Sequence, residues 1–305
     1  MSRAGVLLMT YGSPATLDQA GVGAYLAAVR GGRLPDDELL VEFTRRYQVI
    51  GGSPLIGITQ AQAAALTTRL GWPAAAGMRF SSPTIVDAIR ELMDQDVDQL
   101  VAIILSPQFS PLLMGGYARA LEAARAEIGP GAPEIAIAGA WHLQPAFVGA
   151  LASRLAAAIE GLPADERGTA GILLTAHSLP RRVADQEPGY LDQLRDTANA
   201  VAAAAGLGAD RWTFCWQSAG HEPGEWMKPD FADLMPGIAG AGGRSVIVAP
   251  VQFLADHLEI LYDVDIGARE QAERAGLAFH RIESLNVDPG LIEALAAVAR
   301  ETLPA

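Results

Sequence analysis

Cysteine is nearly absent from this sequence of 305 residues, which contains only Cys215. A single thiol excludes a disulfide framework, a cysteine-based zinc site and a self-contained iron–sulfur cluster, because each of these needs several sulfur atoms. Hydrophobic residues make up 50% of the chain, so a large core can form without such crosslinks. This composition is typical of a protein from a reducing compartment.

Positive charge is also scarce. The formal net charge is −13, and Lys228 is the only lysine, so arginine carries nearly all of the positive charge. Such an acidic protein is a poor partner for nucleic acid and for anionic membrane surfaces. No hydrophobic run reaches the roughly 18 residues of a membrane span, and Gly5–Met9 is too short for the core of a signal peptide. We therefore expect a soluble cytoplasmic protein that binds no nucleic acid and has no integral membrane segment.

Two familiar catalytic motifs are missing as well. There is no P-loop, and no Gly-x-Gly-x-x-Gly sequence follows a predicted strand, so nucleotide binding has no support. Ser178 lies next to His177, but the Gly-x-Ser-x-Gly elbow of hydrolases is absent. The sequence therefore gives no support to a serine hydrolase.

What the sequence does contain is a regular alternation of short aliphatic runs and alanine-rich segments. This alternation predicts an α/β protein, with helices on both faces of parallel sheets. The predicted strands are Val6–Met9, Val101–Leu105, Ile135–Ala138, Ile172–Thr175, Trp212–Trp216, Val246–Val248 and Leu277–Arg281. The predicted helices include Ile85–Met93, Ala118–Ile128, Phe147–Glu160, Tyr190–Ala205 and Leu291–Leu303.

The length of the chain predicts two domains of roughly 150 residues each. The polar stretch Gly161–Thr169 contains glycine and proline and is suited to join two halves. We predict an N-terminal domain over residues 1–150 and a C-terminal domain over residues 151–305. A faint repeat favours two similar halves, because Ile104–Phe109 (ILSPQF) resembles Val248–Phe253 (VAPVQF).

One stretch combines a strand with an acidic helix. The buried run Val246–Val248 ends at Pro250, and Asp256 then stands where the N-cap of a helix is expected. Asp256, Glu259 and Asp263 would share one helix face, where like charges repel unless a cation or a proton relieves them. On spacing alone, a solvated surface is the better interpretation. The position favours a ligand site, because open α/β sheets bind ligands beyond the carboxyl ends of their strands.

Other candidates follow predicted strands or glycine turns. His177 comes directly after a strand, where it could act in catalysis or merely stabilise the loop. We predict a structural role for His257, as a partner of a loop carbonyl, and its spacing means that it need not join the acidic face. Tyr11 stands at the tip of the first strand, as a packed side chain or a ligand. Four arginines lie near glycine turns: Arg30, Arg33, Arg45 and Arg46. They could bind carboxylates, or they could be ordinary surface charges.

Taken together, these motifs resemble those of the ferrochelatase family. The matching sequences come in family order between about residues 5 and 295 and are Tyr11–Pro14, Arg46–Tyr47 with Ile50–Leu55, Ser106–Ser110, Ala176–Pro180, Trp216–Ser218 and Asp256–Glu259. The resemblance implies a class II chelatase-like fold with two Rossmann-like domains, each a four-stranded parallel sheet flanked by helices. It also implies a porphyrin cleft between the domains, and insertion of ferrous iron into a porphyrin with loss of two protons.

The resemblance assigns roles to three side chains along a metal path. His177 matches the catalytic histidine of the family, and Glu259 matches its acidic partner, so both are expected to contact iron. Asp263 matches the next carboxylate leading away from the site and is a candidate for an outer metal site.

Within the family, the sequence looks most like the coproporphyrin III ferrochelatases of Gram-positive-type bacteria, which form coprohaem III. Tyr11 falls where these enzymes carry a tyrosine that binds the iron of the product. Residues that fall near the positions that hold propionates are Arg30, Arg46, Ser53 and Tyr117.

Three positions depart from the family pattern. Phe80 stands where some relatives have a histidine, so a third nitrogen ligand is not expected from it. Gly267 replaces an acidic residue, which weakens an outer or regulatory metal site. Gln252 replaces a common glycine and is expected to narrow the loop before the acidic helix.

The resemblance further implies that iron is a substrate, that no cofactor or iron–sulfur cluster is required, and that the protein is a monomer. An enzyme that takes over coprohaem is a further partner. The alternatives are a protoporphyrin IX ferrochelatase, a cobalt chelatase of the corrin pathway, a non-catalytic tetrapyrrole carrier, and a generic sugar- or nucleotide-binding protein of this fold class.

Overall fold

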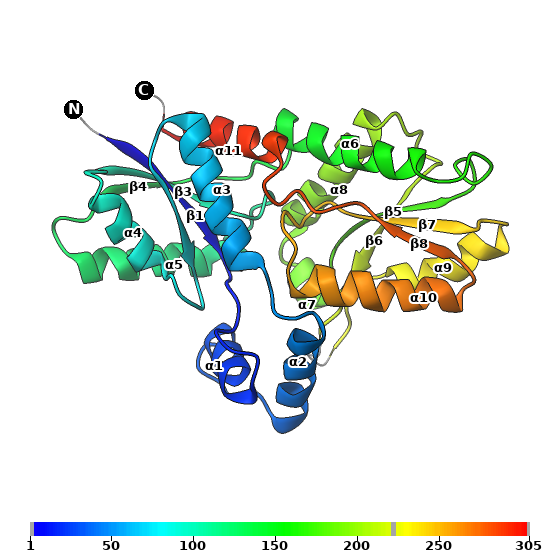
Figure 1. Cartoon of the computed structure of the whole chain (residues 1–305), viewed down its shortest axis with the longest axis horizontal. Coiled ribbons are helices and arrows are strands. Elements are labelled where there is room, and N and C mark those ends of the chain that lie inside the picture. Colours follow the sequence, from blue (N-terminus) through cyan, green and yellow to red (C-terminus); the bar gives the residue numbers. More distant parts are fainter. Residues whose placement is uncertain (1–2, 221–223, 304–305) are drawn as a thin grey trace.

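The computed structural model of the chain describes residues 3–220 and 224–303. It contains two four-stranded parallel sheets, which have the strand orders β2-β1-β3-β4 and β6-β5-β7-β8 (Figure 1). The strands of the first sheet are β1 Ala4–Thr10, β2 Ala74–Met78, β3 Gln99–Ile104 and β4 Glu134–Ile137. Those of the second sheet are β5 Gly171–His177, β6 Thr213–Gln217, β7 Ser245–Pro250 and β8 Ala278–Arg281. The predicted fold class is therefore confirmed.

Helices connect and flank these strands. Those of the first half are α1 Gln19–Val29, α2 Asp37–Val49, α3 Leu55–Leu70, α4 Ile85–Met93, α5 Pro111–Ile128 and α6 Pro145–Glu160. Those of the second half are α7 Arg181–Ala184, α8 Pro188–Ala204, α9 Phe231–Gly240, the π-helix η1 Glu259–Ala268, α10 Arg269–Arg274 and α11 Pro289–Thr302. Among these described helices, none has both the length and the apolar character needed to cross a bilayer.

The sequence analysis missed one strand, β2. Its sequence is AAAGM, which lacks the β-branched and aromatic residues that favour strands. The small residues have a packing reason, because a Cβ added to Gly77 would lie 2.9 Å from the Cα of Ile85 in α4. Close approach of α4 to the sheet thus selects residues that carry a weak strand signal.

A single core cluster runs from one sheet to the other. Buried side chains of the first sheet, such as Val6 and Val101, belong to the same cluster as Ile172 and Ile247 of the second. Helices α6 and α11 pack against each other, and α11 also packs on α3, as Figure 1 shows at the top of the view. The C-terminal helix therefore returns to cover the first half of the chain, and a domain division at residue 150 stays a prediction.

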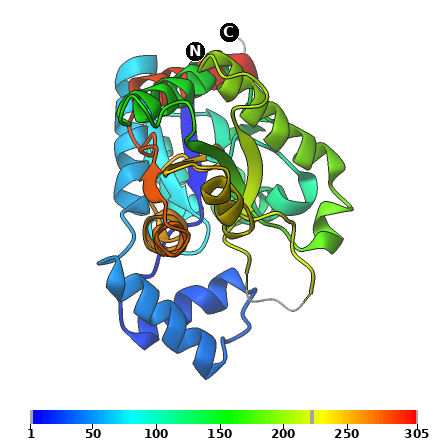
Figure 2. The ribbon, with the colours of Figure 1, turned by 90° about the vertical axis from the view of Figure 1, so that its right-hand side faces the viewer.

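Helices α1 and α2 lie below both sheets in the two ribbon views (Figures 1 and 2). Their small core is formed by Val22, Leu26 and Tyr47, and it also includes Leu258 from the loop before η1. The ring of Tyr262 in η1 packs against the same cluster. This contact brings α2 over the helix that carries the predicted acidic residues.

The two sheets are topologically equivalent, with β1 matching β5 and β3 matching β7. The last paired residue of β1 and β3 is Met9 with Ile104, and that of β5 and β7 is Thr175 with Pro250. The faint sequence repeat aligned Ile104 with Val248, so it is two residues out of the register that the sheets have. In the true register, Tyr11 and His177 occupy equivalent positions, each two residues beyond the last pair.

The buried ring of Phe147 tests the shared core. Its exposed fraction is 0%, and its ring lies 5.4 Å from that of Trp141. Phe147→Ala should lower the free energy of unfolding by about 3–5 kcal/mol, because it leaves a cavity that the core cannot fill. Urea unfolding followed by circular dichroism measures this.

Leu143→Ala is the control, since Leu143 is 49% exposed, and its effect should stay within about 0.5 kcal/mol. Equal effects of the two substitutions would contradict the importance of α6 to the core.

Candidate active site

His177 is the last residue of β5, and its imidazole is fixed by two neighbours. Its Nδ1 lies 2.5 Å from the carbonyl oxygen of Ser178, which places a proton on Nδ1. Its Nε2 lies 3.5 Å from Oε1 of Glu259, and 27% of the side chain is exposed. One ring nitrogen is therefore held by the backbone, while the other faces a carboxylate at the protein surface.

Glu259 is the first residue of η1, and it lies between two imidazoles. Oε2 of Glu259 is 3.3 Å from Nε2 of His257, whose Nδ1 lies 2.8 Å from the carbonyl oxygen of Ala255. The predicted contact of His257 with a loop carbonyl is confirmed. The spacing did not require His257 to join the acidic face, but its ring does contact Glu259, because His257 precedes the helix.

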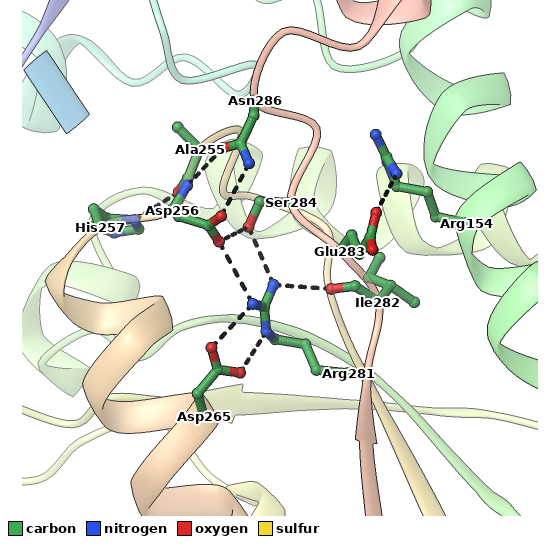
Figure 3. Close-up of polar contacts among 10 residues, drawn as sticks. All are labelled: Arg154, Ala255, Asp256, His257, Asp265, Arg281, Ile282, Glu283, Ser284 and Asn286. Carbon is green, nitrogen blue, oxygen red and sulfur yellow. Dashed lines mark hydrogen bonds and ion pairs between the residues drawn. The ribbon is translucent and has the colours of Figure 1, made fainter. Parts of the chain in front are cut away.

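Asp256 does not cap the helix, and it does not share a face with Glu259. The helix begins three residues later, as a π-helix. The Asp256 carboxylate instead accepts hydrogen bonds from Ser284 at 2.7 Å and from Asn286 at 2.9 Å (Figure 3). The predicted face of three carboxylates is therefore wrong at Asp256, because side chains after β8 hold this residue in the loop.

Arg281 in β8 completes this network by joining two carboxylates. Its guanidinium donates to Asp265 of η1 at 2.6 and 3.0 Å and lies 3.5 Å from Asp256 (Figure 3). Only 14% of the Arg281 side chain is exposed, so these charges are weakly screened by water. The network ties Asp256, in the loop before η1, to Asp265 within η1.

The charges of His177 and Glu259 depend on each other. Burial lowers the pKa of His177, but the Glu259 carboxylate, the Ser178 carbonyl and the charge of Asp263 together outweigh burial and raise that pKa to about 9. Burial raises the pKa of Glu259, while His177 and His257 more than offset this and hold it well below its ordinary value. In the metal-free protein at neutral pH, the two groups form an imidazolium–carboxylate pair.

Asp263 follows Glu259 in η1, and it faces an arginine of α2. Its Oδ1 is 3.4 Å from the guanidinium of Arg46, and only 19% of each side chain is exposed. Burial raises the pKa of Asp263, and the charge of Glu259 adds to this effect. Arg46 also donates to Glu42 at 2.8 Å and lies 5.0 Å from the ring of Tyr262. The predicted propionate partner thus already binds two carboxylates.

Tyr11 comes from the equivalent position of the first sheet, and the residue is 46% exposed. It packs 5.3 Å from Phe80 and 6.1 Å from Tyr117, which is itself only 2% exposed. Loss of surrounding water raises the pKa of Tyr11, and the nearby charge of Glu259 raises it further. The charge of Glu259, from the second half of the chain, thus acts on a residue at the end of the first sheet.

Arg79 is a neighbour of Tyr11 that the sequence analysis did not single out. Its guanidinium lies 4.6 Å from the ring of Phe80 and 5.3 Å from that of Tyr117. Its charge lowers the pKa of Tyr11, against the effect of burial. A run of Met, Arg and Phe after an unrecognised strand gave no signal for this role.

The two remaining propionate candidates lie at helix ends. Arg30 is the C-cap residue of α1, and its buried Nε has no hydrogen-bond partner. Ser53 lies before α3, with its hydroxyl 3.4 Å from the backbone nitrogen of Leu55. Their predicted roles, like those of Arg46 and Tyr117, stay predictions.

The site offers iron a small set of donors. In residues 3–220 and 224–303, there is no group of three or more His, Cys, Asp or Glu side chains suited to hold a metal ion. His177 and Glu259 supply one imidazole and one carboxylate, both of which ferrous iron accepts. Phe80 adds an aromatic ring at the position beside Tyr11, and Gly267 adds no donor.

Comparison with known proteins identifies the family. The model of the family described as Ferrochelatase matches residues 3–303. The chain belongs to the ferrochelatase family. As a ferrochelatase, it is an enzyme of haem biosynthesis that inserts iron into a porphyrin, so the family and the activity predicted from its motifs are confirmed.

Curated relatives match over nearly their whole length. A ferrochelatase of Deinococcus radiodurans is 40% identical over 300 residues, which cover 96% of this chain and 94% of the relative. A coproporphyrin III ferrochelatase of Geobacillus kaustophilus is 35% identical over 304 residues, covering 97% and 94%.

Solved structures show the same fold at low sequence identity. SirB from Bacillus subtilis with Fe3+ has a TM-score of 0.60 at 12% identity, over 99% of this chain and 96% of that one. CbiX, described as the terminal enzyme for biosynthesis of sirohaem in denitrifying bacteria, has a TM-score of 0.56 at 17% identity, over 99% of both chains. At these identities the likeness extends to the fold alone.

Glu259→Gln tests the charge coupling in the site. Without the carboxylate, burial should bring the pKa of His177 below its ordinary value of about 6.5, whereas in the unchanged protein it is about 9. Histidine NMR titration of the metal-free protein measures this. Because the folded-state pKa of His177 is raised and that of Glu259 is lowered, the pair stabilises the fold fully between about pH 4.5 and about pH 6.5. This contribution is lost as the pH rises through the raised value or falls through the lowered one.

The control for that titration is Glu270→Gln, whose carboxylate is 61% exposed and pairs, within the described part of the chain, with Arg274. It should leave His177 unchanged. An identical titration of His177 in Glu259→Gln and in the unchanged protein would contradict the coupling.

Arg281→Met tests the network that fixes the loop. The substitution leaves Asp256 and Asp265 without their shared cation, so the free energy of unfolding should fall by about 3 kcal/mol. Thermal and urea unfolding measure this. Arg274→Met removes an exposed arginine, 3.9 Å from Glu270, and should cost less than about 0.5 kcal/mol. A cost at Arg281 no larger than at Arg274 would be evidence against the network.

Proposed function

We propose that this ferrochelatase inserts ferrous iron into coproporphyrin III, giving coprohaem III and releasing two protons. The observation that carries the proposal is that candidate residues occupy equivalent strand ends in the two sheets. His177 with Glu259 stands at one edge, and Tyr11 stands at the equivalent position of the other. The similarity to coproporphyrin III ferrochelatases, such as that of Geobacillus kaustophilus, supports the choice of porphyrin.

His177 and Glu259 are the proposed catalytic residues and the first contacts for the incoming iron. In the metal-free protein, His177 carries a proton at neutral pH, because Glu259 stabilises the imidazolium. That proton must leave before Nε2 can accept a pyrrole proton or bind iron. Iron insertion should therefore become faster as the pH rises toward the pKa of His177, up to the point where another step limits the rate.

A route for the released protons starts at Glu259. This carboxylate touches both His177 and His257, so it can exchange a proton with either ring. Asp263 continues the line along η1, and its raised pKa makes it a better proton acceptor than an ordinary aspartate. We propose that protons leave by this line and that Asp263 is at most an outer contact for iron.

Tyr11 is the proposed ligand of the iron in the product. Its raised pKa keeps the phenol protonated in the metal-free protein. A metal cation beside the hydroxyl would reverse this preference, since a bound cation stabilises phenolate. Tyr11 would therefore bind iron only after the metal has reached the porphyrin.

The propionates of the porphyrin are assigned to Arg30, Arg46, Ser53 and Tyr117. The buried Nε of Arg30, which lacks a partner, supports this assignment, because a buried donor gains from a carboxylate ligand. Arg46 is shared with Asp263, so a propionate at Arg46 would compete with that pair.

We further propose that iron is the only metal required, as a substrate, and that neither a cofactor nor an iron–sulfur cluster takes part. The single cysteine, Cys215, is buried in β6, which supports the second point. We also propose a cytoplasmic monomer whose product passes to an enzyme that takes over coprohaem.

Protoporphyrin IX is the alternative substrate, because the relative from Deinococcus radiodurans is named only as a ferrochelatase, with no porphyrin specified. A non-catalytic carrier is less well supported, because a carrier needs no imidazole–carboxylate pair.

The experiment follows the visible spectrum of the purified protein with ferrous iron and either coproporphyrin III or protoporphyrin IX, without oxygen. Loss of the free-base bands should be faster with coproporphyrin. His177→Ala should abolish insertion while porphyrin binding stays nearly intact, because His177 acts on protons and iron. His280→Ala, in β8, is the matched control and should retain activity.

Faster insertion into protoporphyrin would refute the choice of substrate but not the reaction. Porphyrin binding without insertion in the unchanged protein would favour the carrier.

A further inference from the structure

Gln252 follows β7 and bonds directly to the backbone of His177. Its side-chain oxygen accepts a hydrogen bond from the backbone N–H of His177 at 2.8 Å. Its side-chain nitrogen donates to the hydroxyl of Tyr190 in α8 at 2.7 Å. Gln252 was expected only to narrow its loop, but both ends of its amide are used to join His177 to a helix.

The contact with His177 replaces a bond that the sheet no longer provides. The backbone N–H of Val251 donates to Thr175 at 2.9 Å, and this is the last bond between the β7 and β5 backbones. Beyond this point the two strands separate, and the next N–H on β5, that of His177, is satisfied by the Gln252 side chain. A buried N–H needs such a partner, so the side chain extends the ladder by one rung.

Tyr190 lies on a face of α8 that also binds the first half of the chain. Gln193 exchanges two hydrogen bonds with the backbone of Phe109, at 2.8 and 3.0 Å. Thr197 accepts one from Gln108 at 2.9 Å. Tyr190, Gln193 and Thr197 are spaced at three and four residues, which places them on one side of a helix. One face of α8 therefore holds both the segment after β3 and the segment after β7.

Tyr190 and Gln252 are well suited to hold the backbone of His177 in a fixed position relative to α8. Tyr190 is only 3% exposed, so its hydroxyl cannot exchange Gln252 for bulk water without moving the helix. His177 in turn has its Nδ1 held by Ser178, so its backbone position sets where Nε2 points. A displacement of the His177 backbone would move Nε2 relative to Glu259.

We propose that Gln252 is a positioning residue for the iron-insertion reaction, fixing the backbone of His177 to Tyr190 and thereby to the first sheet through α8. The proposal rests on the proposed function, since it assigns His177 to catalysis. Gln252 itself touches neither iron nor porphyrin in this role.

The test replaces Gln252 with a side chain of similar length that makes no hydrogen bonds. In Gln252→Met, kcat for insertion of ferrous iron into coproporphyrin III should fall about tenfold or more, with KM for the porphyrin changed by less than about twofold. Tyr190→Phe should lower kcat in the same way. The double variant should be no slower than the slower single variant, because both substitutions break one chain of contacts.

Gln144→Met makes the same chemical change at a residue whose side chain binds Glu301 instead, at 2.7 Å. It should leave kcat and KM unchanged. A loss of kcat in this control equal to that of Gln252→Met would overturn the proposal, as would a Gln252→Met variant with kcat within about twofold of the unchanged protein.

Amide hydrogen exchange at His177, read by NMR on the metal-free protein, separates this proposal from the proposed function. Exchange should be faster in Gln252→Met and in Tyr190→Phe than in the unchanged protein. An unchanged exchange rate overturns the positioning role even if the enzyme is active. Absence of iron insertion by the unchanged protein, with faster exchange in the variants, overturns the proposed function while the link to His177 stands.

Discussion

The carboxylate of Glu259, held between two imidazoles, is the interaction on which the rest of the site depends. This carboxylate is only partly exposed to water, and His177 and His257 each contact one of its two oxygens. The pair can only form if η1 begins at the carboxyl edge of the second sheet. The network around Asp256 and Arg281 holds the loop so that it does. The attraction between Glu259 and His177 that stabilises this pair also raises the pKa of His177, so His177 holds its proton more strongly.

The two sheets are aligned by helices that cross between the halves of the chain. Helix α11 returns to pack on α3, and α8 bonds to the segments after β3 and β7. From below, α2 reaches η1 through the contact of Arg46 with Asp263. The positions of Tyr11 and His177 relative to each other therefore depend on packing over much of the molecule, although each side chain belongs to one strand end.

The predicted elements were correct where hydrophobic side chains and local propensity agree. Helix α4 matches its predicted range, and Thr84 and Asp87 form a capping box at its start. Strand β2 was missed because the close approach of α4 requires small residues there, and alanine and glycine do not predict a strand. The same limit applies to Asp256, which has the side chain of an N-cap but is bound by residues that follow β8. Local signals fail where a distant segment supplies the decisive contact.

The sequence by itself determined the alternation of strands and helices, the single cysteine, and the motifs that place the chain among ferrochelatases. These follow from the order and type of neighbouring residues, which can be seen in the sequence directly. Only the tertiary structure decided that His257 turns toward Glu259, that Arg46 is shared with Asp263, and that Gln252 holds the backbone of His177. Each of these contacts depends on the position of a loop or helix end, which the packing of the whole fold sets. The spacing of residues along the chain does not show that position.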